Sequence, residues 1–339
     1  MGYEPLLLRV ERPERELRRR GGLRPAPPGA VATGEQNRGH QEHAGAPVDS
    51  AAMRVLVTGA SGFVGRALVE ELRHKGRAYG VHPLERRDGD LAEEGVAERA
   101  VADAKPDVVV HAAARIGVAR CDDEPLLALR SNVLATVLVA RACAEHRARL
   151  AYVSTADVYG AIAEADEETP PAPASLYALT KWWGEQAAGL YAPDGLVVLR
   201  LANPYGPGVE PGQGKGALPT MLRQAERGKP LPAFRGEARS WCWIGDVAGA
   251  VRLVLESGAA GVFNVGSDDP PVALTDAARL VCELAGASPD LVEEVEPPPG
   301  RVAPRIAVGR LRALGWRPEV GLEEGLRLTL ESWQAAPAL

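Results

Sequence analysis

The sequence predicts an α/β protein with a doubly wound parallel sheet and a smaller C-terminal α/β lobe. Short apolar runs alternate with helical stretches between residues 53 and 266, which is the order that βαβ units produce. The first of these runs leads into a turn with glycines at positions 59, 62 and 65 and then into a helical pattern. A strand, a glycine-rich turn and a helix in this order are typical of the Rossmann dinucleotide site.

Composition excludes several functional classes. The chain of 339 residues is 46% hydrophobic and 25% charged, and its net charge of -6 does not favour nucleic acid as a partner. No uninterrupted apolar run approaches the roughly 20 residues of a membrane helix, so we expect no membrane partner. The cysteines are scattered without metal-ligand spacing, so we expect reduced thiols, no metal and a cytoplasmic protein. They are Cys121, Cys143, Cys242 and Cys282.

Residues 1–52 differ from the rest of the chain. They are rich in Arg, Glu, Gly and Pro and show no sustained apolar periodicity. This predicts either a disordered N-terminal extension or upstream sequence joined to a protein whose natural start is Met53. We expect no catalytic part in this segment. Residues 53–208 would form the dinucleotide-binding domain, and residues 209–339 the substrate lobe, interleaved with strands that return to the first sheet.

Short apolar runs predict each strand of the sheet. Val55, Leu56 and Val57 form a short apolar run, as strands buried on both faces do. Helical patterns such as "SNVLATVLVARACAEH" separate the runs that come later. The predicted later strands are Asp107–Ala114, Leu150–Thr155, Leu196–Leu201 and Gly261–Gly266.

Tyr177 and Lys181 suggest proton chemistry. They lie four residues apart in "SLYALTKWWGE", so on a helix they share one face. A tyrosine has an ordinary pKa of about 10, and a nearby cation favours its phenolate form. Ser154 and Thr155 supply hydroxyl groups at the end of a predicted strand, and ligands bind at the carboxyl ends of parallel strands. These features predict one acid–base site on the rim of the sheet.

With these motifs in place, the chain from Met53 to Trp333 resembles the extended short-chain dehydrogenase/reductase family. That family contains NAD-dependent nucleotide-sugar epimerases, dehydratases and reductases. The resemblance depends on the order of several short segments along the chain. They are "VTGASGFVG", "GDL", "HAAA", "STADVYG", "YALTK", "RLANPYGPG", "RSWCWIGDVAGAV", "NVGS" and "LGWRPEVGLEEGL".

The resemblance implies a role for each matching residue. Tyr177 would be the catalytic acid or base, Lys181 would bind the nicotinamide ribose and lower the pKa of Tyr177, and Thr155 would hydrogen-bond the reacting oxygen. Asn203 and Arg239 would hold the substrate's diphosphate, with a turn cap and a surface salt bridge as the respective alternatives. The cofactor-binding residues would be Gly59, Ser61, Gly62, Phe63, Val64, Gly65, Arg86, Asp90, Leu91, Ala112, Ala113, Asn132, Tyr177 and Lys181.

Departures from the family pattern refine the expected cofactor. Members that prefer NAD usually end the second strand with an acidic residue, whereas this chain offers His82 there, followed by Arg86 and Arg87. Arginines without an acid suit a 2′-phosphate, so we expect NADP(H) or NAD(H), with a slight preference for NADP(H). The alternative is that both arginines face water.

The expected reaction is hydride transfer at a secondary alcohol or ketone carbon, at C4 of a nucleotide-linked sugar, by a 4-ketoreductase or 4-epimerase. Ala156-Asp157 lacks one acid of the 4,6-dehydratases, which disfavours dehydration. Pro298 and Trp243 differ from the UDP-sugar epimerases, so reduction of a small non-sugar ketone or aldehyde is the alternative. A non-catalytic dinucleotide sensor is third. The family also suggests a homodimer.

Overall fold

Six parallel strands form the central sheet of the protein. The computed structural model describes residues 52–74, 79–192, 194–208, 216–297 and 305–335. The order β11-β6-β4-β3-β1-β2 confirms the predicted doubly wound sheet. Its strands are β1 (Met53–Thr58), β2 (Tyr79–Leu84), β3 (Val108–His111), β4 (Arg149–Thr155), β6 (Val197–Leu201) and β11 (Gly261–Val265). The chain leaves β1 toward β2 on one side and returns to β3 on the other, so ligands are expected where β1 and β3 end.

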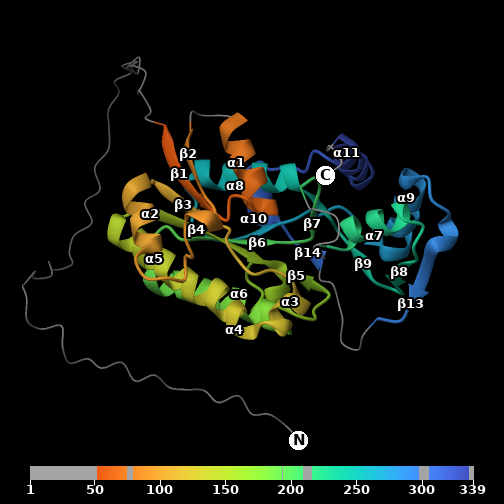
Figure 1. Cartoon of the computed structure of the whole chain (residues 1–339), viewed down its shortest axis with the longest axis horizontal. Helices are drawn as coiled ribbons and strands as arrows, with labels where there is room; N and C mark the ends of the chain where they lie inside the picture. Colours follow the sequence, from red (N-terminus) through yellow and green to blue (C-terminus); the bar gives the residue numbers. More distant parts are fainter. Residues whose placement is uncertain (1–51, 75–78, 193, 209–215, 298–304, 336–339) are drawn as a thin grey trace, which may run out of the picture. The chain divides into compact units, whose positions relative to one another are not determined.

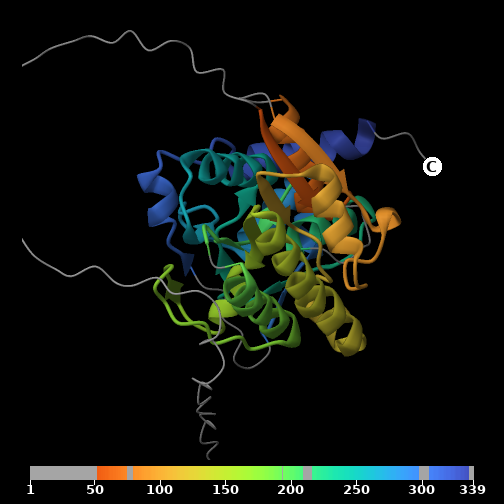
Figure 2. The same ribbon diagram turned by 90° about the vertical axis from the view of Figure 1, so that its left-hand side faces the viewer.

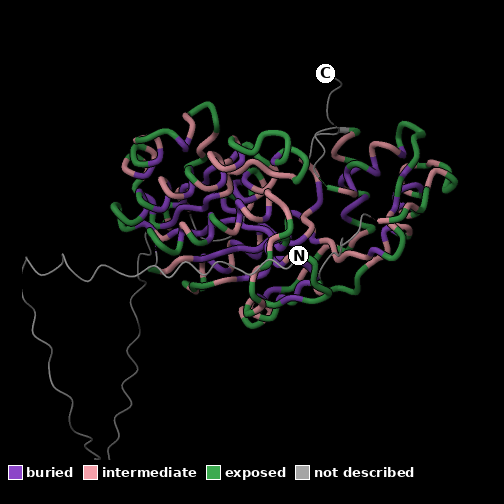
Figure 3. Tube along the Cα trace, turned by 90° about the horizontal axis from the view of Figure 1, so that it is seen from below, coloured by how far each residue is buried: buried purple, intermediate pink, exposed green. Residues whose placement is uncertain are grey.

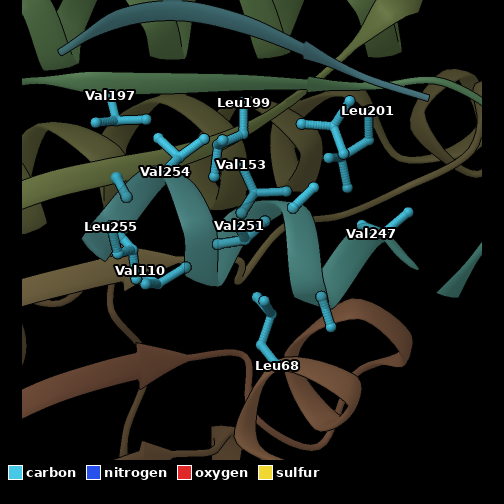
Figure 4. Close-up of a cluster of buried hydrophobic side chains, with 14 of the residues drawn as sticks. Leu68, Val110, Val153, Val197, Leu199, Leu201, Val247, Val251, Val254 and Leu255 are labelled. Carbon is cyan, nitrogen blue, oxygen red and sulfur yellow. The ribbon is translucent and has the colours of Figure 1, made fainter. Parts of the chain in front are cut away.

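Helices cover both faces of this sheet, as Figure 1 shows. Side chains of successive strand residues point to opposite faces, so Val55 and Val57 join one buried cluster and Leu56 joins another. The first cluster packs against α1 (Phe63–His74) and α8 (Ile244–Ser257). Figure 4 shows Leu68 of α1 and Val251 of α8 in this cluster.

The opposite face is covered by three helices and carries the catalytic candidates. They are α2 (Val96–Ala104), α5 (Ala135–His146) and α6 (Leu176–Tyr191). The long helices α5 and α6 pack against each other (Figure 2). Before α5 the chain forms α3 (Val118–Asp123), α4 (Pro125–Leu129) and a π-helical turn at Arg130–Leu134.

The C-terminal part builds a third buried cluster from its own helices and short strands. Purple, buried segments lie inside this part as well as along the central strands in Figure 3. Its elements are β7 (Pro204–Tyr205), α7 (Ala217–Glu226), β8 (Leu231–Phe234), β9 (Ala238–Arg239), β10 (Cys242–Trp243), β12 (Val272–Ala273), α9 (Leu274–Ala285), β13 (Val292–Val295) and α11 (Leu322–Ala335). Two further strands, β5 (Glu164–Ala165) and β14 (Arg305–Ile306), pair with each other, and α10 (Gly309–Ala313) packs beside β11.

Strand β11 comes from the C-terminal half of the chain and pairs with β6 along its whole length. Chain from beyond residue 208 therefore contributes to the central sheet, as the sequence predicts for the returning strands. The division into a domain at 53–208 and a lobe at 209–339 stays a prediction. The expected N-terminal extension lies outside the described residues, apart from Ala52.

One helical stretch, Pro125–His146, has the length and composition that a membrane-crossing helix needs, and an 18-residue window within it has a mean hydropathy of 1.5. Arg130, Asn132 and Arg141 interrupt it, so it is not the uninterrupted apolar run that the sequence analysis considers. Core helices of water-soluble proteins pass the same test, and 44% of that window is buried inside the protein. Arg130 lies within it and forms an ion pair with Asp90, which favours the core-helix interpretation.

Candidate active site

A cavity of about 510 Å³ opens where β1, β3 and β4 end. It is lined by every residue predicted to be catalytic and by all predicted cofactor residues except Asn132, which is buried behind it. Those lining residues are Gly59, Ser61, Gly62, Phe63, Val64, Gly65, Arg86, Asp90, Leu91, Ala112, Ala113, Thr155, Tyr177 and Lys181. Asn203 and Arg239 do not line it.

The glycine turn has the shape of a phosphate cradle. Gly59 adopts a φ of +65°, and a Cβ there would lie 2.7 Å from the backbone nitrogen of Ala113. A Cβ on Gly65 would lie 2.2 Å from the carbonyl oxygen of Gly59. Only glycine permits this close approach, which leaves the first turn of α1 facing the cavity with unpaired N–H groups. Those groups suit the pyrophosphate of a dinucleotide.

The end of β2 differs from the sequence prediction. His82 pairs with Leu56 within the strand, which continues through Pro83 to Leu84. Proline is tolerated because β2 is the edge strand, where its missing N–H costs no ladder bond. The residue that follows β2 and lines the cavity is therefore Glu85, and the expectation of a missing acid is wrong. Arg86 lines the cavity beside Glu85.

Asp90 is held in place by two donors. Its Oδ1 accepts a hydrogen bond from the Ala92 backbone at 2.9 Å, and its Oδ2 accepts from Arg130 at 3.1 Å. The Ala92 N–H and then the Arg130 guanidinium keep the pKa of Asp90 below its usual value. The cavity therefore has a fixed carboxylate at this position.

Asn132 supports the site from behind. Its side chain accepts a hydrogen bond from the backbone nitrogen of Arg115 at 2.7 Å and donates to the Arg115 carbonyl at 2.9 Å. It also donates to Thr180 Oγ1 at 3.0 Å. One buried amide thus joins the loop after β3 to the helix that carries Tyr177 and Lys181.

His111 ends β3 and lies at the centre of a buried chain of hydrogen bonds. Thr136 Oγ1 donates to the Asn132 carbonyl, so it accepts from His111 Nε2 at 3.2 Å. Nδ1 of His111 then accepts from the Thr58 hydroxyl at 2.7 Å. Burial, and then the charge of Lys181, lower the pKa of His111 to about 3, so the imidazole is neutral.

The three catalytic candidates come from β4 and α6. Thr155 is the last residue of β4, and Ser175 caps α6 by accepting a hydrogen bond from the Ala178 nitrogen at 3.2 Å. This cap places Tyr177 in the first turn of the helix and Lys181 one turn later. All three side chains line the same cavity.

The pKa values of this pair differ from the sequence expectation. Burial, and then the charge of Asp157, raise the pKa of Tyr177, while the nearby hydroxyl of Thr155 lowers it. Burial lowers the pKa of Lys181 to about 7, against the opposing effect of Glu185. Lysine therefore loses its proton before the phenol does.

Asn203 and Arg239 lie close together through Ser240. Asn203 has a φ of +43°, and its side chain donates to the Ser240 carbonyl at 3.0 Å. Arg239 donates through Nε at 2.7 Å to the buried carboxylate of Glu237. This partner was not predicted, and it makes the Arg239 ion pair internal rather than a surface salt bridge.

Sequence reasoning missed several residues of the cavity wall, above all Glu85 and Arg115. Arg115 directly follows "HAAA", so its position after β3 was a usable signal. Ser154, expected as a hydroxyl donor beside Thr155, also lines the cavity. Over the described ranges, no group of three or more potential metal ligands lies together.

Comparison with known proteins agrees with this geometry. The model of the NAD dependent epimerase/dehydratase family matches residues 55–266. A dTDP-4-dehydrorhamnose reductase of Mycolicibacterium smegmatis is 32% identical over 74% of this chain and 75% of its own length. A UDP-glucose 4-epimerase of the same organism is 32% identical over 82% of this chain and 98% of its own.

A solved structure shows the same fold with a cofactor. The Thermus thermophilus UDP-glucose 4-epimerase in complex with NAD superposes with a TM-score of 0.76 at 31% identity, covering 84% of this chain and all of that one. The family match spans the glycine turn, Thr155, Tyr177 and Lys181. The chain therefore belongs to the NAD dependent epimerase/dehydratase family, whose members modify nucleotide sugars.

Proposed function

We propose that this protein transfers hydride at C4 of a nucleotide-linked sugar, as a 4-ketoreductase or a 4-epimerase. The observation that carries the proposal is the single cavity that Thr155, Tyr177 and Lys181 share with the glycine turn. A reacting carbinol or ketone and a dinucleotide can meet there. A nicotinamide cofactor bound in this cavity would accept or give the hydride.

The chain's own residues would handle the proton. Tyr177 gives a proton to the substrate oxygen during reduction and takes it during oxidation. Thr155 donates a hydrogen bond to the same oxygen and keeps it near the phenol. Lys181, one helical turn behind Tyr177, supplies positive charge that favours the phenolate when the lysine is protonated.

The substrate class is supported by the relatives. Their names specify a dTDP-linked sugar for the reductase and UDP-glucose for the epimerase. Asn203 and Arg239, adjacent through Ser240, are the residues we propose for the diphosphate. Arg239 would then exchange part of its contact with Glu237 for the phosphate oxygens, because a guanidinium has five N–H donors.

Glu85 lies where the sequence analysis expected no acidic residue, and this affects the expected cofactor. A carboxylate at the end of the second strand accepts hydrogen bonds from ribose hydroxyls and repels a 2′-phosphate. We therefore propose NAD(H) in preference to NADP(H). Arg86 beside it is the residue that would admit NADP(H) if Glu85 were removed.

The test follows reduced-nicotinamide absorbance with NADH and separately with NADPH, offering 4-keto sugars linked to UDP, dTDP and GDP. Steady consumption that disappears in Tyr177→Phe would establish a reductase. Interconversion of 4-hydroxy sugars without net consumption, also lost in Tyr177→Phe, would establish an epimerase. Neither activity with any nucleotide sugar would refute the proposal.

One observation favours the alternative, reduction of a small non-sugar ketone or aldehyde. Glu237 already neutralises Arg239 and is itself buried. An anion would have to compete with this carboxylate. If Arg239→Ala leaves the affinity for UDP and dTDP unchanged, the small-substrate alternative replaces the nucleotide sugar.

We also propose a cytoplasmic homodimer that associates through the helices around α6. Apolar side chains remain exposed on this surface, with Leu126 and Leu190 at 80% and 73%. Trp183 and Tyr191 of α6 are also exposed. Light scattering of the wild type and of Leu190→Glu tests this association, since a charge in a paired apolar surface should give monomers.

A further inference from the structure

Lys181 is buried without a counter-ion in direct contact. Its side chain is 3% exposed, and its Nζ lies 4.2 Å above the centre of the Tyr152 ring. Within the described chain, no carboxylate forms an ion pair with it. A buried ammonium is costly unless negative charge nearby offsets its lost hydration, so a carboxylate close to the lysine would favour its charged form.

Glu185 is the carboxylate placed to do so. Tyr177, Lys181 and Glu185 follow one another at intervals of four residues on α6, so they share one helix face. Glu185 is as buried as Lys181, with a side chain only 4% exposed. No substrate can reach it directly, because it does not line the cavity.

Two neighbours fix the Glu185 carboxylate. Ser154, the residue before Thr155 on β4, donates its hydroxyl to Oε1 at 2.5 Å. Arg200 of β6 donates through Nε to Oε1 at 3.1 Å and through Nη2 to Oε2 at 2.7 Å. Ser154 and Arg200 are paired residues of adjacent strands, so the sheet itself sets where this carboxylate lies.

Arg200 is in turn fixed from its other side. Its guanidinium lies 4.8 Å from the centre of the Tyr159 ring, and the Tyr159 hydroxyl donates to Asn264 Oδ1 at 2.7 Å. The buried polar chain thus runs from α6 across the sheet to β11. Networks of this kind hold charges at defined positions when every member is satisfied.

We propose that Glu185 is a positioning residue: held by Ser154 and Arg200, its carboxylate keeps Lys181 protonated and in place beside Tyr177. Other groups also face Lys181, namely His111 of β3, Cys121 of α3, Tyr152 of β4 and Tyr177 of α6. His111 is neutral. Of all the groups near Lys181, Glu185 has the largest effect in favour of the charged lysine. The consequence for hydride transfer rests on the proposed function, whereas the ionisation of Lys181 can be measured without substrate.

The experiment is an NMR titration of the full-length protein labelled with ¹³C at lysine Cε. The chain contains only five lysines, so a Lys181→Arg variant identifies the signal of interest. Wild-type Lys181 should titrate near pH 7. In Glu185→Gln its midpoint should fall by about one pH unit or more.

The effect of Glu185→Gln on the Lys181 midpoint must be separated from its effect on the stability of the protein. Removing one partner of a buried ion pair leaves the charge of the other uncompensated and destabilises the fold. The double variant Glu185→Gln/Arg200→Gln removes both charges and should recover stability. Its Lys181 midpoint should lie between those of Glu185→Gln and the wild type, because the repulsion from Arg200 is lost together with the attraction of Glu185. Tyr159→Phe is the matched control, since it loosens the far end of the network and keeps both charges. Its Lys181 midpoint should equal that of the wild type.

Two results would overturn the proposal. One is a Lys181 midpoint that does not move in the folded Glu185→Gln variant. The other is loss of the fold in both Glu185 variants, which would make the residue's role purely structural. Absence of turnover with every nucleotide sugar would count against the proposed function alone, because the titration needs no substrate.

Discussion

Asn132 and Thr180 are joined by a buried side-chain hydrogen bond of 3.0 Å, which ties the π-helical turn before α5 to the catalytic helix α6. Thr180 directly precedes Lys181 and also donates to the Tyr177 carbonyl at 2.9 Å. The catalytic helix is therefore held from its side by a residue that does not touch the cavity.

Asn132→Ala should destabilise the protein by about 2–4 kcal/mol, because the Arg115 backbone groups and Thr180 lose their buried partner. Urea unfolding measures this change. Thr180→Val removes only one of these bonds and should cost about 1 kcal/mol. Equal losses in the two variants would show that Asn132 does not hold the Arg115 loop.

The sheet and the acid–base pair could be predicted because their signals are local. Strands buried on both faces produce apolar runs such as the three valines at 108–110, and one helical turn brings Tyr177 and Lys181 together whatever the rest of the chain does. The glycine turn is likewise contained in seven consecutive residues of the sequence, from 59 to 65. Each of these features lies within one element or one turn.

The parts that sequence reasoning missed depend on tertiary structure. His111 has its partners 53 and 25 residues away, and Ser154 is 31 residues from Glu185. Glu85 was overlooked because the sequence analysis ends the second strand at His82, whereas the strand continues through Pro83 to Leu84. That proline is harmless only on an edge strand, and the strand order is not a local property of the sequence.

His111 should make the protein sensitive to acid. Its pKa is lowered from the ordinary 6.5 to about 3, so between these values the unfolded chain binds a proton that the folded protein does not. The free energy of unfolding should therefore fall as the pH decreases from 6.5 toward 3, by up to about 1.4 kcal/mol per pH unit. This stabilisation is fully present above pH 6.5.

Urea unfolding at several pH values tests this dependence. His111→Gln should flatten the slope over this range even if the variant is less stable throughout. His146→Gln, at the exposed end of α5, is the control and should keep the wild-type slope. An unchanged slope in His111→Gln would assign the acid sensitivity to other groups.

Glu85 should determine the cofactor. Glu85→Ser removes the carboxylate that would repel a 2′-phosphate and leaves Arg86 beside the site. The ratio of the dissociation constants for NADP(H) and NAD(H) should shift toward NADP(H) by about tenfold or more. Calorimetric titration with both cofactors measures this ratio.

Arg87 provides the control for this experiment. It pairs with Glu85 at 3.2 Å, but its side chain is 78% exposed and does not line the cavity. Arg87→Ala should leave the cofactor ratio nearly unchanged, while Arg86→Ala added to Glu85→Ser should reverse part of the gain for NADP(H). If Glu85→Ser binds both cofactors as the wild type does, Glu85 does not contact the ribose.

Two glycines of α6 should respond in opposite ways to alanine. A Cβ on Gly184 would lie 2.1 Å from the hydroxyl of Tyr152, the buried ring beneath Lys181. Gly184→Ala should therefore destabilise the protein by about 1–3 kcal/mol and displace the lysine. Gly189 is exposed, and its nearest neighbour, Leu196, would be 3.9 Å away, so Gly189→Ala should stabilise the helix by up to about 1 kcal/mol.

Thermal or urea unfolding of the two variants distinguishes steric conflict from helix propensity, since both changes add the same methyl group to the same helix. Tyr152→Phe in the Gly184→Ala background removes the hydroxyl in conflict and should recover part of the lost stability. If Gly184→Ala matched Gly189→Ala, α6 would have room to move away from β4. The close packing inferred for Lys181 and Tyr152 would then not hold.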